Sequence, residues 1–212
     1  MCFSATASFA AGAGLVAAGV YSIGRARDPR ERPYAAIPLL FGVQQLIEGV
    51  IWLTFRFDAP VLNPAMTFVY SLFSHVLWPM YVPFATRAME PAASRRRWML
   101  GFAAAGGAAG LYLLVNMVRF PIESREVDGH IEYASPHFFA ALVMASYLAG
   151  TCLSPLFSSH RHVVLFGVAA LGSFVFSYVV YTRWFISVWC FFAAVLSIVV
   201  LAHVLAPKRG VA

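Results

Sequence analysis

Charged residues are scarce in this sequence. Of its 212 residues, only 11% are Asp, Glu, Lys or Arg, whereas 61% are hydrophobic. An ordinary soluble domain is about a quarter charged, because ionised side chains must cover its surface. The shortage of charge therefore excludes an ordinary soluble domain. The abundance of apolar side chains also excludes an intrinsically disordered chain, which has too little apolar surface to bury.

Cysteine and lysine are also rare, and each shortage excludes a class of protein. The three cysteines, Cys2, Cys152 and Cys190, are too few and too scattered for a disulfide-bonded scaffold. The only lysine in the sequence, Lys208, lies beyond the last apolar run. A retinal protein needs a lysine Schiff base inside its helices, so that class is excluded as well.

Long apolar runs are what the sequence has instead. A membrane-spanning helix needs about 20 mostly apolar residues to cross a hydrocarbon core ~30 Å thick. Transmembrane strands would alternate in polarity, and these runs do not. We therefore predict an all-α fold: a multi-pass membrane protein whose residues 1–212 form one seven-transmembrane-helix bundle. The predicted spans are 3–23, 34–55, 65–86, 98–118, 137–157, 163–182 and 184–206.

The basic residues predict the orientation. With these spans, 11 of the 15 Lys and Arg residues fall on one side of the membrane, chiefly in the connections 24–33 and 90–97. Cytoplasmic loops are enriched in Lys and Arg, so we expect the N-terminus outside and the C-terminus in the cytoplasm. The first span has no basic region before it, which favours an anchor over a cleavable signal peptide.

The same arginines bear on the partners of the protein. They lie beside the spans, where topology and anionic lipid account for them. The lipid bilayer is therefore the expected partner, and we expect no nucleic acid.

Small residues indicate where helices pack closely. The first span spaces Ala10, Gly14 and Ala18 four residues apart, and the fourth contains AAAGGAAG over residues 103–110. In lipid, helices associate where small side chains let the backbones approach. We expect close contacts at Ala103 and Gly107, or at Gly106 and Gly110.

One acid lies well inside a predicted span. Glu48 belongs to FGVQQLIEGVIWL (41–53), where Gln44, Glu48 and Trp52 share one helix face and Gln45 flanks it. An acid at a helix centre costs ~2.5–3.5 kcal/mol on insertion scales, so this face should point into the bundle. Glu48 is then either a functional group or a structural acid hydrogen-bonded to a neighbouring helix.

One histidine is equally deep. His75 lies in SLFSHVLWPMYVP (71–83), where Trp78 shares its helix face. At ~1.5 Å per residue, Glu48 lies about 10 Å and His75 about 15 Å below the outer boundary. A carboxyl and an imidazole at similar depth stabilise each other, so we predict that they face one another. The alternative is that His75 only joins helices through hydrogen bonds.

Further polar residues, Tyr178 and Ser187, fall in the outer half of later spans. Together these groups predict an outward-facing buried polar pocket that binds a small molecule or a lipid. The predicted ligand-binding residues are Gln44, Gln45, Glu48, Trp52, His75, Trp78, Tyr178 and Ser187.

A metal is a further hypothesis for this pocket. Zn²⁺ accepts mixed N, O and S ligands, which Glu48, His75, Cys190 and Cys2 could supply. The sequence contains no HxxxH, HExxH or CxxC motif, so each ligand would come from a different span. A disulfide between Cys2 and Cys190 is the competing hypothesis for the two cysteines.

Three functions stay open at this point. The first is a membrane protein that binds a small ligand or metal ion. The second is a membrane-embedded hydrolase, metal-dependent or not, that acts on a lipid or another amphiphile. The third is a proton-linked carrier with Glu48 as its titrating group.

Four segments also carry a resemblance. The stretches MCFSATASF, QQLIEGVIW, LWPMYVP and SVWCFFAA are similar to those of a family of small bacterial integral membrane proteins of unknown function. The resemblance extends over nearly the whole chain. It implies a seven-helix protein of the bacterial inner (plasma) membrane and carries no activity, cofactor or site residue with it.

Overall fold

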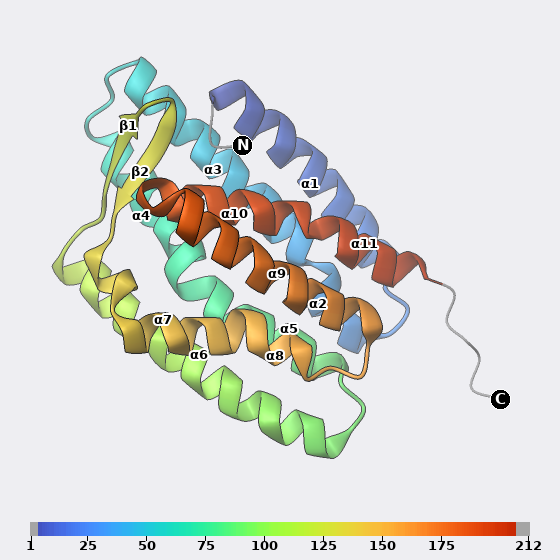
Figure 1. The fold of residues 1–212 in the computed structure, drawn as a ribbon. Coiled ribbons are helices and arrows are strands. Elements are labelled where there is room, and N and C mark those ends of the chain that lie inside the picture. The colour runs from blue at the N-terminus through green and yellow to red at the C-terminus, as the bar shows by residue number, and fades with distance from the viewer. Residues whose placement is uncertain (1–3, 207–212) are drawn as a thin grey trace.

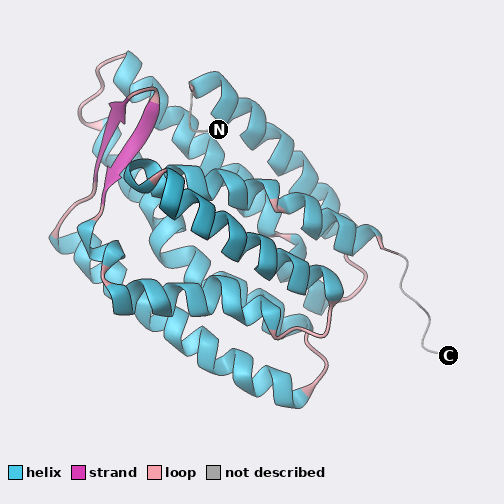
Figure 2. Ribbon diagram, in the orientation of Figure 1, coloured by secondary structure: helices cyan, strands magenta, loops and turns pink. Residues whose placement is uncertain are grey.

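The structure, a computed structural model, describes residues 4–206 apart from the side chain of Ala193. These residues are mostly helical, as expected, and the helices lie side by side as a bundle (Figures 1 and 2). Five helical segments are long and apolar enough to cross a membrane. They are Ala5–Arg25, Pro29–Arg56, Ala93–Arg119, Arg161–Val180 and Thr182–Leu205.

The first half of the chain forms three helical rods. Ser4 caps the first by accepting a hydrogen bond from the Ala7 N–H. The elements are α1 (Ala5–Arg25), the 3₁₀ turn η1 (Pro29–Glu31), α2 (Arg32–Ala35), α3 (Ile37–Arg56), α4 (Leu62–Ser71), the π-helical η2 (Leu72–Leu77) and α5 (Trp78–Met89).

The second half adds a long helix, a β-hairpin and three further rods. The elements are α6 (Ala93–Arg119), β1 (Glu123–Val127), β2 (His130–Ala134), η3 (Pro136–Phe139), α7 (Ala141–Leu148), the π-helical η4 (Ala149–Leu153), α8 (Ser154–Leu156), α9 (Arg161–Val180), η5 (Thr182–Trp184), α10 (Phe185–Val195) and α11 (Ser197–Leu205).

Two of the seven predicted spans contain a π-helical stretch. The span 65–86 is interrupted by η2, and the span 137–157 is interrupted by η4 and begins with the 3₁₀ turn η3. Each π-helical stretch ends shortly before a proline, Pro79 or Pro155. A proline has no N–H and its ring collides with the carbonyl four residues earlier, and a wider turn relieves that collision.

The connection 119–136, between the predicted spans 98–118 and 137–157, contains an antiparallel β-hairpin. Val127 pairs with His130, so Asp128 and Gly129 form a two-residue turn, with φ angles of 52° and 73°. Asp-Gly is a preferred sequence for a turn that needs positive φ at both positions. The hairpin covers the end of the bundle at which α3 connects to α4 (Figure 1).

Glycines set the closest helix contacts. In α1 the buried contact residues are Gly12 and Gly19, which pack on α3, whereas Gly14 faces open space. The expectation that Ala10, Gly14 and Ala18 form the contact is therefore wrong, because the packed face is rotated from that stripe. In α6, Gly106 packs against Pro79 and Gly150, and Gly110 packs against Val76 and Met80. These contacts confirm the expected close approach at Gly106 and Gly110.

At the opposite end from the hairpin, Glu90 ties α5 to the connection before α9. Its Oε1 accepts hydrogen bonds from the Ala92 N–H and the Ser159 hydroxyl, and its Oε2 accepts from the Ser159 N–H and the Ser158 hydroxyl. Burial acts to raise the pKa of Glu90, but these donors outweigh it and hold the pKa below its ordinary value.

The neighbouring glycines of α6 provide a matched test of this packing. A Cβ at Gly106 would collide with the Pro79 carbonyl oxygen, whereas one at Gly107 meets nothing within 4 Å. We expect Gly106→Ala to lower the free energy of unfolding by ~1–3 kcal/mol, the usual cost of overpacking. Gly107→Ala should be neutral or stabilise by up to ~1 kcal/mol, because alanine favours the helix.

Unfolding of the two variants in detergent, followed by circular dichroism, measures both changes. Equal stability of the variants would contradict the contact between α6 and α5.

Candidate functional site

Three polar residues of α3 are completely enclosed by the bundle. Gln44, Gln45 and Glu48 are 0%, 1% and 0% exposed, as the sequence led us to expect of a face that avoids lipid. The neighbouring Trp52 is also buried, at 7% exposure, but its ring packs edge to face on Phe55 of the same helix. The polar groups of α3 are therefore set between helices.

The carboxyl of Glu48 connects α3 to α10. Ser187, which is itself fully buried, donates a hydrogen bond of 2.7 Å to Oε1. The side chains of Gln45 and Tyr70 also face this carboxyl. Tyr70 brings in α4, so three elements distant in sequence meet at one acid.

Gln44 forms a second link beside the first. Its Nε2 donates to the Cys190 Sγ at 3.2 Å, and its Oε1 accepts from the Trp78 indole N–H at 2.7 Å. Phe41 stacks on the Trp78 ring with 3.8 Å between centroids. The amide thus joins α3, α5 and α10. We call Gln44, Gln45, Glu48, Tyr70, Trp78, Ser187 and Cys190 the polar cluster.

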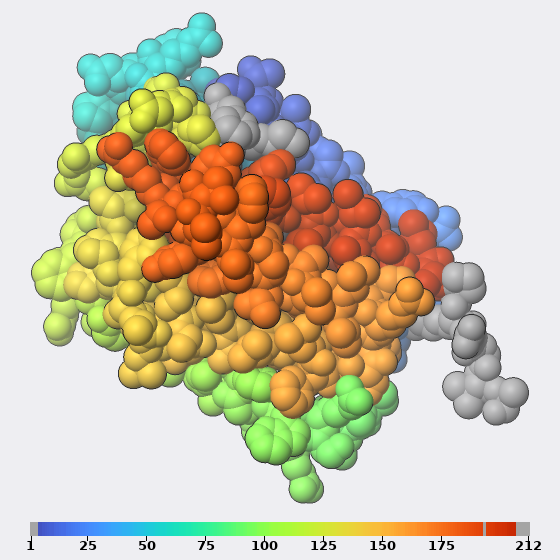
Figure 3. All heavy atoms as spheres, viewed as in Figure 1, coloured from blue at the N-terminus to red at the C-terminus, as the bar shows by residue number. Residues whose placement is uncertain are grey.

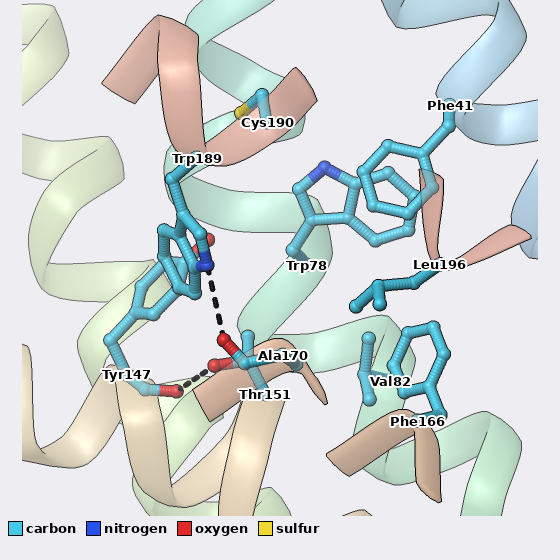
Figure 4. Close-up of a pocket in the computed structure, with 10 residues that line it drawn as sticks. All are labelled: Phe41, Trp78, Val82, Tyr147, Thr151, Phe166, Ala170, Trp189, Cys190 and Leu196. Carbon is cyan, nitrogen blue, oxygen red and sulfur yellow. Dashed lines mark hydrogen bonds between the residues drawn. The ribbon is translucent and has the colours of Figure 1, made fainter. Parts of the chain in front are cut away.

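A small cavity adjoins the polar cluster (Figure 4). Its volume is about 40 Å³. A water molecule needs about 10–15 Å³ measured in this way, so the space fits a few waters or the end of a small molecule. The lining residues are Phe41, Trp78, Val82, Tyr147, Thr151, Phe166, Ala170, Trp189, Cys190 and Leu196.

His75 is buried but lies in a different group of contacts. Its Nδ1 is 2.8 Å from the Ser74 hydroxyl and its Nε2 is 2.8 Å from the Ser135 hydroxyl, while its ring packs edge to face on Phe138. Within residues 4–206, no ion pair joins His75 to Glu48. The predicted face-to-face pair is not formed.

Two features of the structure keep His75 from pairing with Glu48. His75 lies in the π-helical η2, so its direction differs from that of a residue in a regular α-helix. The segment after the hairpin then supplies Ser135 as the partner of His75. The apolar runs of the sequence do not predict this hairpin.

Ser135 also borders a pocket at the hairpin end of the bundle. The pocket has a volume of about 160 Å³. Its walls are mostly apolar. They are formed by Leu113, Asn116, Met117, Phe120, Pro121, Ile122, Ala134, Ser135, Pro136 and His137.

The hairpin contacts both the polar cluster and the start of α10. Tyr133 of β2 stacks on Tyr70 at 4.5 Å with nearly parallel rings. Arg183 donates to Glu132 at 3.1 Å, and His130 stacks on Trp184 at 4.9 Å. The atoms of the hairpin pack directly against the start of α10 in Figure 3. Tyr70 and Tyr133 were missed by the sequence analysis, although the Asp128-Gly129 turn was a usable signal for the hairpin.

Tyr178 does not belong to the polar cluster. It lies on α9, its side chain is 44% exposed, and its ring stacks on Phe174. It therefore lies on the outer surface of the bundle.

The predicted metal ligands do not assemble in the described part of the chain. Residues 4–206 contain no group of three His, Cys, Asp or Glu side chains that could hold a metal ion. Cys190 accepts a hydrogen bond from Gln44, Glu48 accepts one from Ser187, and His75 is hydrogen-bonded to two serines. Each of these three predicted ligands therefore has another partner. Cys2, the fourth predicted ligand and the predicted disulfide partner of Cys190, lies outside the described residues.

Comparison with known proteins identifies a family but no activity. Neither a curated protein nor a solved structure matches the chain. The family model that does match covers residues 1–211, almost the full length. As the four sequence segments predicted, the chain belongs to a family of unknown function, DUF6629.

Proposed function

We propose that the protein crosses the bacterial inner membrane seven times, with its N-terminus outside, and binds a small amphiphilic molecule inside the bundle. Five helices long and apolar enough to span support the membrane location. Exposed apolar side chains on their outer faces, such as Leu111 and Val118 of α6 at 61% and 67% exposure, suit contact with lipid tails.

The remaining two crossings are the interrupted rods. The rod α4–η2–α5 runs from Leu62 to Met89, which at ~1.5 Å per residue is long enough to span. The apolar helix Ala141–Leu156 is shorter, and a short span is accommodated by local thinning of the bilayer. The arginine distribution then places the hairpin outside.

The ligand proposal rests on one observation: Cys190 belongs both to the polar cluster and to the wall of the cavity. A buried polar group next to an aromatic cavity suits a molecule with a hydrogen-bonding head and an apolar body. The end of the molecule that enters the cavity would contact Cys190 and lie between Tyr147, Phe166 and the two tryptophans, Trp78 and Trp189.

A cavity-filling variant tests this proposal. Ala170 is buried in the cavity wall, so Ala170→Leu should occupy the space, whereas Ala108→Leu places the same side chain on the exposed face of α6. We expect one or more of indole, phenol, benzylamine and hexanol to raise the melting temperature of the wild type. A ligand at 100 times its Kd adds about 2.7 kcal/mol of stability.

The shift should persist in Ala108→Leu and disappear in Ala170→Leu. No shift with any compound, or an equal shift in both variants, would overturn the ligand proposal.

A second candidate function is hydrolysis of a membrane-derived ester, and the pair Ser135–His75 favours it. A serine hydroxyl 2.8 Å from an imidazole nitrogen is within the distance that lets histidine accept the serine proton. Ser135 borders the 160 Å³ pocket, whose apolar walls suit an acyl chain. With Nε2 as acceptor, Nδ1–H donates to Ser74, which fixes the ring.

The reaction would follow from these positions. The Ser135 oxygen attacks the ester carbonyl while His75 takes its proton, and His75 then protonates the departing alcohol. Water, deprotonated by His75, next attacks the acyl-serine. The bond to the Ser135 oxygen breaks, the acid is released, and His75 returns the proton to that oxygen. By contrast, Ser187 donates its hydrogen bond to the Glu48 carboxyl, so it is a poorer nucleophile.

A fluorophosphonate probe, which labels activated serines, tests the hydrolase candidate. We expect labelling of the Ser135 peptide in the wild type, loss in Ser135→Ala and His75→Gln, and no change in Ser159→Ala at the other end of the bundle. An unlabelled wild type, or unchanged labelling of His75→Gln, would contradict it.

A further inference from the structure

Three arginines line one pocket where α5 ends and α6 begins. The pocket has a volume of about 260 Å³, and it is formed by Arg87, Ala93, Arg96, Arg97 and Leu100. The four residues from α6 have the spacing i, i+3, i+4 and i+7, so they share one helix face. Arg87 comes from the last turn of α5, and the connection from α5 to α6 lies at the lower right of the bundle in Figure 1.

No acid of the described chain pairs with these arginines. The ion pairs within residues 4–206 are Arg125–Glu123 and Arg183–Glu132, both at the hairpin end. Glu90, the acid closest in sequence, directs its two oxygens to Ala92, Ser158 and Ser159. Among residues 4–206, no carboxylate therefore forms an ion pair with the arginines of the pocket.

The backbone increases the positive charge of the pocket and fixes part of it. Arg87 Nε donates to the backbone carbonyl oxygen of Arg96 at 3.3 Å, which ties the end of α5 to the start of α6. The first turn of α6 has no side-chain cap and contains no acid. Its free N–H groups add the positive end of a long helix dipole beside Ala93. An anion with several acceptor oxygens would satisfy both sets of donors.

An apolar groove runs along η2 and α5, and its last residue in sequence, Phe84, lies one helical turn before Arg87. It has a volume of about 500 Å³ and is lined by Leu72, Val76, Leu77, Met80, Tyr81 and Phe84. Met80 and Phe84 are 49% and 57% exposed, and the spacing of residues 80, 84 and 87 places them on one face of α5. Trp98, 68% exposed, has the position of an interfacial anchor.

We propose that the pocket and the groove together bind one anionic phospholipid. The arginines and the start of α6 would hold its phosphate diester, and an acyl chain would lie in the groove on α5. A free phosphate ion would satisfy the arginines but leave the apolar groove unexplained, so the combination favours the lipid.

Native mass spectrometry of the full-length protein in detergent tests the proposal with two probes of identical acyl chains, phosphatidylglycerol and phosphatidylcholine. We expect phosphatidylglycerol to bind about tenfold more tightly, because charge-assisted hydrogen bonds to phosphate are the strong ones. Arg96→Gln combined with Arg97→Gln should remove that preference. Both residues are exposed, so the double variant should melt like the wild type.

The matched control removes two exposed arginines from the same predicted side of the membrane, as Arg27→Gln with Arg30→Gln. It should bind phosphatidylglycerol within about twofold of the wild type. Equal loss in the two double variants would mean attraction by net charge alone and would overturn the site. Displacement of phosphatidylglycerol by excess inorganic phosphate would assign the pocket to the free ion and also overturn the proposal.

Discussion

The hydrogen bond between Glu48 and Ser187 is the interaction on which the interior depends. A carboxyl in the middle of an apolar bundle must find its donors among neighbouring side chains, because neither lipid nor bulk water reaches it. The donor comes from α10, 139 residues further along the chain. Satisfying one acid of α3 therefore fixes the position of α10, and with it Cys190, the second polar link and the wall of the cavity. The site is a consequence of this requirement as much as of side-chain volume.

The two interrupted rods and the hairpin give the bundle its second polar centre. The π-helical turns before Pro79 and Pro155 change the direction of nearby side chains, and close contacts between Pro79, Gly106 and Gly150 lock these rods to α6. The hairpin then covers one end of the bundle and supplies Tyr133 to Tyr70 and, just beyond β2, Ser135 to His75. Two buried ionisable residues, Glu48 and His75, thus belong to separate polar centres. Glu48 is enclosed among helices, and His75 contacts Ser135 beside the pocket at the hairpin end.

The sequence predicts the features that depend on composition and helical spacing. Residue type and the 3.6-residue period are enough to predict the apolar runs and the burial of Glu48 with Gln44 and Gln45. They also predict the close helix contacts made by Gly106 and by Gly110. The partner of His75 could not be found in this way, because it depends on a π-helical turn and on a hairpin docked from 60 residues away. The depth of Tyr178 in its span predicts a place in the pocket, but depth does not determine which face of α9 turns outward. The family model shows that the domain extends over residues 1–211, but it assigns no chemistry to any residue.

A double-mutant cycle between Glu48 and Ser187 tests the central claim most directly. Glu48→Leu, Ser187→Ala and the combination are unfolded in detergent, and the free energy of unfolding of each is compared with the wild type. If the buried carboxyl depends on the serine, Ser187→Ala costs ~1–3 kcal/mol when Glu48 is present and almost nothing when it is absent. Additive effects, with a coupling below about 0.5 kcal/mol, would show that α3 and α10 are not joined through this bond.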